Sequence, residues 1–180
     1  MSAKYWILNI MVIMLIACEA SKPDVQYSIS TCAPIPVPRA AAVSFVVGEY
    51  AYVFGGRDAE GNYLNDLWRY DIANDAWTSM RETPLKSRVN ATACVRNGIV
   101  YIGLGFNGQY SNSTGYLSDW WSYNASTDTW QQLSDFPANT TARAISLVGD
   151  GELYVGYGFC WTYERDMYRY NIVEDMWSFI

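Results

Sequence analysis

One segment of about 50 residues occurs three times in this chain, and the repeat limits the fold more than any other feature of the sequence. Each copy ends with an aspartate, one further residue and a tryptophan, at Trp77, Trp130 and Trp177. A period near 50 residues with four short β-type runs per copy is typical of a propeller blade. We therefore expect an all-β chain with three four-stranded blades, at about residues 39–80, 88–133 and 143–180.

Small residues and large rings recur at fixed places in each copy. The first strand of each copy is rich in alanine, for example at Ala42, Ala91 and Ala144, and blades taper toward the centre of a propeller, where the innermost strand has least room. Tyrosines and tryptophans recur on the outer strands, where large rings can fill the space between blades. We interpret these recurring residues as framework rather than as a binding motif.

The motifs of the first copy resemble those of the kelch family. They are a glycine pair that closes the second strand (Gly55-Gly56), an Asp-x-aromatic-x-Tyr-Asp third strand that begins at Asp66, and Trp77 in the fourth. The second and third copies have Leu104 and Tyr157 where the glycine pair would begin. The resemblance covers residues 39–180 and implies a kelch-type β-propeller.

Three blades are fewer than a propeller ring needs, because rings close with about four to eight blades. Two expectations stay open. The chain is a truncated propeller, or it is half of a six-bladed ring that a homodimer completes. The sequence favours truncation, because the terminal repeats lack a polar cap.

The first 38 residues read as an export and anchoring segment. Lys4 precedes a short apolar run at residues 7–17, which indicates a signal peptide over residues 1–17. Leu15-Ile16-Ala17-Cys18 resembles a bacterial lipobox, in which Cys18 would be lipidated, with residues 18–38 as a tether. We therefore expect a lipid-anchored protein of the bacterial cell envelope, and Glu19 favours the outer membrane. The alternatives are an ordinary signal peptide with a chance cysteine, or an N-terminal anchor helix.

Composition excludes several classes of function. The chain has no histidine, which removes histidine-based nucleophile activation and imidazole metal ligands. It also excludes the activity of galactose oxidase, a kelch-like propeller whose copper site needs two histidines. The formal net charge of −6 argues against nucleic acid as a partner. We predict no metal site, no cofactor and no catalytic residue.

Candidate ligand-binding residues lie on three long loops that would share one face of the propeller, at residues 57–65, 106–118 and 159–165. Functional residues concentrate on loops that a rigid scaffold holds, and aromatic planes beside amides and charged groups suit sugars or extended peptides. The candidates are Arg57, Asp58, Tyr63, Phe106, Asn107, Tyr110, Trp161 and Tyr163.

Arginine recurs once per copy before the inner strand, at Arg39, Arg88 and Arg143. One interpretation is that these arginines ring the channel mouth and attract a carboxylate. The interpretation that the repeat favours is a structural salt bridge in each blade, to Asp66, Asp119 and Asp166.

Two classes of function remain. The first, which we favour, is an envelope-tethered binding module that recognises a glycan, a peptide or a neighbouring envelope protein through its long loops. The second is a carbohydrate-active enzyme of the sialate mutarotase type, inactive if the propeller is incomplete.

Overall fold

The computed structural model describes residues 30–109, 115–138 and 141–180, and all of these from Cys32 onward belong to the unit Cys32–Ile180. The regular secondary structure in the described part of this unit consists of β-strands. Most strands belong to three four-stranded antiparallel sheets. The first sheet contains β1 (Val43–Val47), β2 (Tyr50–Phe54), β3 (Leu67–Asp71) and β4 (Ala76–Ser79). The second contains β5 (Thr92–Arg96), β6 (Ile99–Gly103), β7 (Trp120–Asn124) and β8 (Thr129–Leu133). The third contains β9 (Ile145–Gly149), β10 (Glu152–Gly156), β13 (Met167–Asn171) and β14 (Met176–Phe179), and a two-stranded hairpin, β11 (Phe159–Cys160) and β12 (Thr162–Tyr163), lies between β10 and β13.

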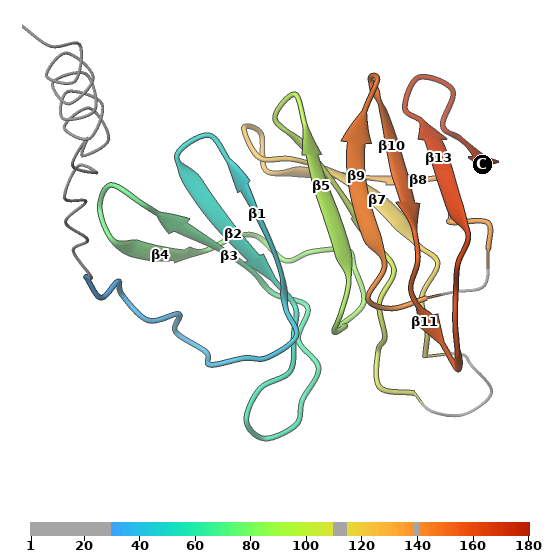
Figure 1. The fold of residues 1–180 in the computed structure, drawn as a ribbon. Helices are drawn as coiled ribbons and strands as arrows, with labels where there is room; N and C mark the ends of the chain where they lie inside the picture. The colour runs from blue at the N-terminus through green and yellow to red at the C-terminus, as the bar shows by residue number, and fades with distance from the viewer. Residues whose placement is uncertain (1–29, 110–114, 139–140) are drawn as a thin grey trace, which may run out of the picture. The chain divides into compact units, whose positions relative to one another are not determined.

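The three sheets are blades that pack against one another through their inner strands. Strand β1 contacts β5, and β5 contacts β9, so the blades follow one another in chain order (Figure 1). Within each blade the strands pair with their neighbours in sequence, apart from the inserted hairpin. This arrangement confirms the expected all-β fold with three four-stranded blades. The predicted signal peptide and Cys18 lie outside the described residues, and none of the described residues forms a helix that could cross a membrane.

Local sequence explains where the inner hairpins turn. Asn97-Gly98 joins β5 to β6 with φ values of 52° and 78°, and Asp150-Gly151 joins β9 to β10 with 48° and 81°. Two central residues with positive φ form the tight turn whose twist matches that of the flanking strands, and Asn-Gly and Asp-Gly favour it.

The turn after the second strand begins with a left-handed residue in all three blades, although only blade 1 has the glycine pair. Leu104 and Tyr157 adopt φ values of 57° and 48° at the position that Gly55 occupies with 65°. Gly105 follows with a φ of 98°, and a Cβ there would lie 2.7 Å from the carbonyl oxygen of Val89. Blade 2 therefore keeps the turn of blade 1 with a different first residue, whereas blade 3 keeps only its left-handed first residue, because Gly158 does not share the positive φ of Gly56 and Gly105.

Apolar side chains fill the two junctions between blades. Phe45, Tyr52 and Phe54 of blade 1 pack against Val100 and Ile102 of blade 2. The second junction is built in the same way. Its buried residues are Cys94, Tyr101, Leu104, Trp120, Phe136, Leu153, Val155 and Tyr170. Burial in this cluster raises the pKa of the Cys94 thiol to about 12.

In blades 1 and 3 the Asp-x-Trp motif ties the outermost strand to the segment that enters the blade, whereas in blade 2 the buried Nε1 of Trp130 has no hydrogen-bond partner among the described residues. In blade 3, Asp175 accepts a hydrogen bond from the backbone N–H of Ser134 at 2.8 Å, and the indole N–H of Trp177 donates to the Ser134 carbonyl at 2.8 Å. In blade 1, Asp75 and Trp77 hold both backbone groups of Ala33 in the same way. Hydrogen bonds from Tyr170 and Ser134 outweigh burial and hold the pKa of Asp175 below its usual value. The motif is therefore framework, as the repeat predicts.

Candidate functional site

A pocket of about 420 Å³ opens where the inner ends of the three blades meet. In each blade an entry residue forms a β-bridge with the residue that follows the second-strand turn. The bridges join Ala40 to Arg57, Val89 to Phe106, and Ala142 to Phe159. Because the blades repeat this arrangement side by side, the six residues converge on one mouth, which all of them line.

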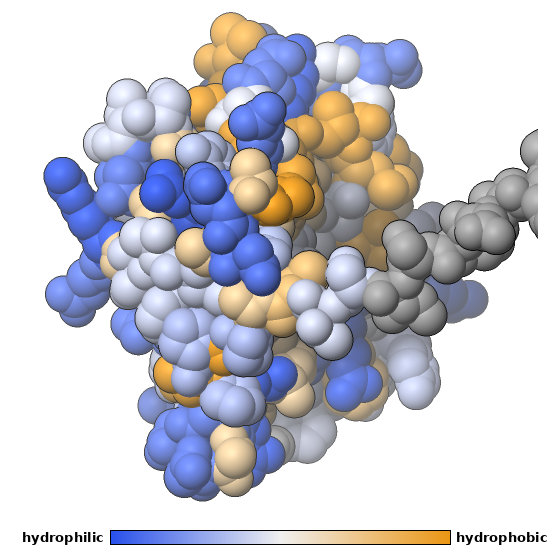
Figure 2. Space-filling model, turned by 90° about the vertical axis from the view of Figure 1, so that its left-hand side faces the viewer, coloured by the Kyte–Doolittle hydropathy of each residue, from blue (hydrophilic) through white to orange (hydrophobic). Residues whose placement is uncertain are grey.

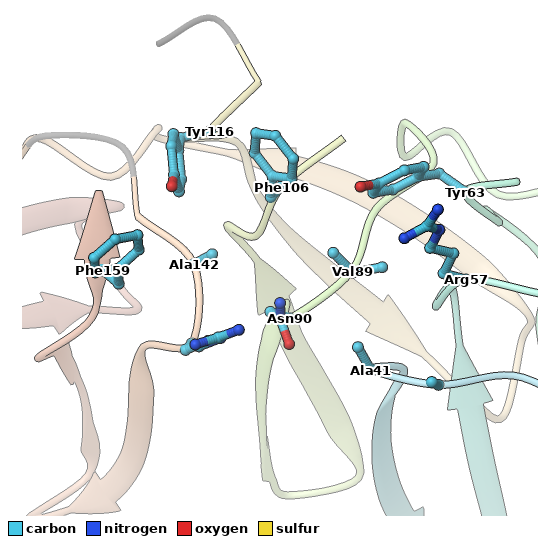
Figure 3. A pocket seen from close by; sticks show the side chains of 11 residues that line it. Ala41, Arg57, Tyr63, Val89, Asn90, Phe106, Tyr116, Ala142 and Phe159 are labelled. Carbon is cyan, nitrogen blue, oxygen red and sulfur yellow. The ribbon is translucent and has the colours of Figure 1, made fainter. Parts of the chain in front are cut away.

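Aromatic rings form one wall of the pocket. Tyr116, Phe106 and Tyr63 stand in a row there, with Phe159 at one end (Figure 3). The ring centroids of Tyr63 and Phe106 are 6.2 Å apart, and those of Phe106 and Tyr116 are 5.0 Å apart. Such edge-to-face and tilted contacts are favourable for aromatic pairs, and they fix the wall before any ligand arrives.

The opposite wall consists of three residues in the left-handed conformation, one from each blade. Ala41, Asn90 and Arg143 have φ values of 57°, 54° and 61°. The N–H of Asn90 donates to the carbonyl of Ala41 at 2.9 Å, and the N–H of Arg143 donates to the carbonyl of Asn90 at 2.9 Å. A chain of backbone hydrogen bonds therefore runs from blade to blade around the mouth and places three different side chains in equivalent positions.

This register corrects the alignment of the three arginines. Arg39 and Arg88 come one residue before the bridged Ala40 and Val89, whereas Arg143 comes one residue after the bridged Ala142. The residue of blade 3 that matches Arg39 and Arg88 is Thr141. Arg143 is therefore not a third copy of the same structural arginine.

The structural salt bridge exists in blades 1 and 2. Arg88 donates to both carboxylate oxygens of Asp119 at 2.7 Å and to the carbonyls of Leu104 and Lys86. Arg39 binds Asp66 in the same two-pronged way, at 2.6 and 2.9 Å. Burial alone would raise the pKa of Asp66, but hydrogen bonds from Arg39 and Trp68 bring it below its usual value. The expected pair of Arg143 with Asp166 is absent from the described residues.

The channel-mouth interpretation therefore applies to only one of its three arginines. Arg143 is exposed and lines the pocket, while the guanidinium groups of Arg39 and Arg88 are turned into the protein and buried in their ion pairs.

The loop candidates divide in a similar way. Arg57, Tyr63 and Phe106 line the pocket. Asp58 instead closes its own loop by accepting hydrogen bonds from Asn62 and Gly61, which hold its pKa below the usual value. Asn107 accepts from the backbone of Gln109. Tyr110 lies outside the described residues.

The last two candidates, Trp161 and Tyr163, are exposed on the β11–β12 hairpin beside the pocket rather than in its wall. Trp161 meets the edge of Tyr116, and Tyr163 meets Phe159.

Asn90 and Phe159 line the pocket but were not among the predicted binding residues. A signal for Asn90 was present in the sequence. Aligning the copies on Ala42, Ala91 and Ala144, instead of on the arginines, places Ala41, Asn90 and Arg143 in one column. A signal for Phe159 was also present, because it follows Gly158 as Arg57 follows Gly56 and Phe106 follows Gly105.

The charged side chains in the described lining of the pocket are all positive. Arg57 and Arg143 supply two guanidinium groups, and the part of the lining that the structure describes contains no aspartate or glutamate. Arg57 is oriented by a hydrogen bond from its Nε to the carbonyl of Gly61 at 3.1 Å, and its Cζ lies 5.8 Å from the centre of the Tyr63 ring. Guanidinium groups bind carboxylates by paired hydrogen bonds, and the adjacent rings offer flat apolar surface. The arrangement suits a small acidic ligand with an apolar or sugar-like face.

Comparison with known proteins gives a consistent result. Residues 11–180 match the family model described as the KLHDC2/KLHL20/DRC7 Kelch-repeats domain. The chain is 28% identical over 118 residues to Kelch domain-containing protein 3 of Rattus norvegicus, a match that covers 58% of this chain and 30% of that protein. It is 30% identical over 90 residues to N-acetylneuraminate epimerase 1 of Escherichia coli O6:H1, covering 47% of this chain and 22% of that protein.

A solved structure has the same fold. The structure described as "Structure of YjhT" superposes with a TM-score of 0.70 and 18% sequence identity, over 84% of this chain and 54% of that one. The chain spans less than a third of the length of the curated relatives that it matches, and about half of this structural neighbour.

Proposed function

The chain belongs to the family of KLHDC2/KLHL20/DRC7 kelch-repeats domains, and from this premise we propose that it is a binding module whose channel-mouth pocket takes a carboxylate-bearing glycan. Kelch repeats indicate an interaction module, and the pocket supplies the specificity. The observation that carries the proposal is that Arg57 and the exposed Arg143 both line a pocket with an aromatic wall and no acidic residue in its described lining.

A carboxylate fits this pocket better than a neutral or cationic group. Two guanidinium groups without a compensating acid in the lining favour an anion, and Asn90 adds an amide that can donate to a hydroxyl or carbonyl oxygen. Sugar rings stack their apolar faces on aromatic planes, which the wall of Tyr63, Phe106 and Tyr116 provides. The relative named N-acetylneuraminate epimerase 1 supports an acidic sugar as the ligand class.

Replacing Arg143 with glutamine is expected to weaken the binding of N-acetylneuraminate by about 10- to 100-fold, because a hydrogen bond to a charged group contributes about 1.5–3 kcal/mol. Isothermal titration of the purified chain measures the change. Arg81→Gln is the matched control, since the Arg81 side chain is 81% exposed and outside the pocket, and it should leave the affinity unchanged. Equal affinities for the wild type and the Arg143 variant would show that N-acetylneuraminate does not bind in this pocket.

A second candidate function is carbohydrate-active catalysis of the sialate mutarotase type. The sequence similarity to N-acetylneuraminate epimerase 1 favours it. The pocket gives it little chemistry, because the hydroxyls of Tyr63 and Tyr116 are the only titratable groups besides arginine in the described lining. The described lining contains no histidine, aspartate, glutamate or lysine, the side chains that most often transfer protons in catalysis. A polarimetric mutarotation assay on N-acetylneuraminate separates the two functions, since saturable binding without turnover supports the module.

The proposal places this module on the bacterial cell envelope through a lipid on Cys18. The lipobox-like Leu15-Ile16-Ala17-Cys18 supports a diacylglyceryl anchor, which would hold the chain at a membrane, with the outer membrane favoured by Glu19.

The anchor is tested by replacing Cys18 with serine in the full-length chain, expressed in a bacterial host. The wild type is expected to incorporate a labelled fatty acid and to partition into detergent, and the variant should lose both properties because it lacks the acceptor thiol. Cys32→Ser is the control and should keep the label. Equal labelling of wild type and Cys18→Ser would contradict the anchor.

A further inference from the structure

We propose that the outward face of blade 3 binds the outward face of blade 1 in a second copy of this chain, so that two copies close one six-bladed ring. The inference does not depend on the ligand proposed above. It rests on the two blade junctions within one chain, which show what each face of a blade packs against.

The outward face of blade 3 is built like a blade junction but has no blade against it among the described residues. Leu147 pairs with Tyr154 across β9 and β10 on this face. The side chain of Leu147 is 52% exposed, whereas the residues in the same place, Phe45 in blade 1 and Cys94 in blade 2, are 7% and 8% exposed. Three more exposed apolar side chains share this face, namely Ile145, Met176 and Ile180. The face therefore presents the apolar surface that the next blade covers at the other two junctions.

The outward face of blade 1 offers the complementary surface. Val53 on β2 is only half-buried there, while Ile102 and Val155, in the same place on blades 2 and 3, are fully buried against the preceding blade. A cavity of about 410 Å³ lies on this side, and Val53, Ser44 and Trp77 are among its lining residues. Figure 2 views the molecule from this side and shows hydrophobic side chains gathered in its upper half.

Backbone polar groups at the two faces match in the same way. At the first junction the N–H of Asn90 donates to the carbonyl of Ala41, and the N–H of Gly56 donates to the carbonyl of Arg88. The second junction repeats both bonds, from Arg143 to Asn90 and from Gly105 to Thr141.

A third junction needs four groups. Blade 3 supplies the carbonyl of Arg143 and the N–H of Gly158, and blade 1 of the second copy supplies the N–H of Ala41 and the carbonyl of Arg39. None of the four has a backbone partner within the described part of the chain. Donors and acceptors are therefore left over in complementary positions, and a third junction would pair them as it covers them.

Charges are complementary as well. At the first junction the charges of Arg69 of blade 1 and Asp128 of blade 2 both affect the pKa of Tyr52, in opposite directions. The residues in the same places at a third junction are Arg169 of blade 3 and Asp75 of blade 1. Arg169 lies 3.2 Å from Glu152 and is half-exposed, so its guanidinium remains accessible to a second copy.

Two copies related by a two-fold axis would make the same blade 3 to blade 1 junction twice and leave no open face.

Engineered cysteines test the register of this junction. The hydroxyls of Thr92 and Ser146 are 2.8 Å apart at the second junction, and the matching pair at a third junction is Ile145 of one copy and Ser44 of the other. The full-length chain, in mild detergent and with Cys18, Cys32 and Cys160 changed to serine, is therefore given Ser44→Cys and Ile145→Cys. Cys94 is kept, because burial raises its pKa to about 12 and makes it unreactive.

On mild oxidation the Ser44→Cys/Ile145→Cys chain is expected to form a covalent dimer. Thr92→Cys/Ser146→Cys should form a disulfide within one chain, so it should stay monomeric on the gel while losing two free thiols, and that loss shows that oxidation occurs at this spacing. Ser44→Cys/Val173→Cys should form no dimer, because Val173 lies in the turn between β13 and β14 and is 94% exposed. Failure of the first pair to cross-link while the Thr92/Ser146 pair does would overturn the proposal, as would a ladder of trimers and larger species.

A charge on the face gives a second test without cysteines. Light scattering of the wild-type chain is expected to show a dimer, and Leu147→Asp is expected to give a monomer with unchanged near-UV circular dichroism. Val173→Asp places the same charge outside the face and should remain dimeric. A wild type that is monomeric at micromolar concentration, or a Leu147→Asp variant that stays dimeric, would contradict the inference.

Discussion

Replacing Asp119 with alanine is expected to lower the free energy of unfolding by about 3–5 kcal/mol, because the change leaves the Arg88 guanidinium buried without its counter-charge. The Arg88 side chain has no exposed surface, and Asp119 binds it through both carboxylate oxygens while also accepting the indole N–H of Trp121 at 2.9 Å. Urea unfolding followed by tryptophan fluorescence measures the loss.

Asp166→Ala is the matched control for this prediction. Asp166 is the same residue of the repeat in blade 3, but it is exposed and has no arginine partner among the described residues. Its replacement should cost less than about 1 kcal/mol, as for other exposed side chains. If both variants lower the free energy of unfolding equally, blade 3 has the same kind of salt bridge as blades 1 and 2, and Arg143 is not free to line the pocket.

Gly105→Ala is expected to cost about 3 kcal/mol or to prevent folding. The backbone there has a φ of 98°, and an added Cβ would lie 2.7 Å from the Val89 carbonyl oxygen and 3.0 Å from the Ala91 nitrogen. Both contacts are with backbone of the strand entry that forms the pocket wall, so neither can move without disturbing it. Thermal unfolding by circular dichroism gives the size of the effect.

Gly98→Ala separates backbone strain from the clash. Gly98 also has a positive φ, 78°, but nothing lies within 4 Å of the position of its Cβ. Its replacement should cost only the strain of the left-handed conformation, about 1 kcal/mol. If Gly98→Ala destabilises the chain as much as Gly105→Ala, the close approach between the turn and the strand entry is not what makes glycine necessary at residue 105.

The fold could be predicted because the features that define a blade are local and repeat three times. These features are visible within a few residues of sequence: turn residues such as Asn97-Gly98, the strand patterns, and the Asp-x-Trp pattern itself. The hydrogen bonds that the Asp-x-Trp motif makes could not be predicted from so short a stretch. Asp175 and Trp177 bind Ser134, about 40 residues earlier in the chain, and only the packed structure brings them together.

The site was only partly predictable because the same residue type serves two purposes in this repeat. Arg39, Arg88 and Arg143 each lie close before the alanine that precedes an inner strand, namely Ala42, Ala91 and Ala144, so spacing alone placed them in one column. The bridges of Ala40, Val89 and Ala142 show that Arg143 is offset by two residues. A shift of two residues keeps the side-chain alternation but exchanges a buried ion-pairing position for one in the pocket wall. Arg57, Tyr63 and Phe106 lie together in the pocket, since the loops that carry them leave the blades at the same edge (Figure 1).

The blades therefore share a framework and differ in the residues that they place at the channel mouth. Ala41, Asn90 and Arg143 occupy one backbone position in three blades and supply a methyl group, an amide and a guanidinium. Arg57, Phe106 and Phe159 differ similarly at the position opposite. A repeat that keeps its backbone while varying these positions can build an asymmetric pocket from symmetric parts, which ligand recognition requires.

The most direct test of the account is to titrate the wild-type chain with N-acetylneuraminate and with its methyl ester at equal ionic strength. The ester keeps the shape of the sugar and removes the negative charge. The account predicts saturable binding of the acid, and at least about tenfold weaker binding of the ester because the charged hydrogen bonds to Arg57 and Arg143 are lost. Equal affinities for the two ligands, or no binding of the acid at millimolar concentration, would contradict the claim that this pocket recognises an acidic sugar by its carboxylate.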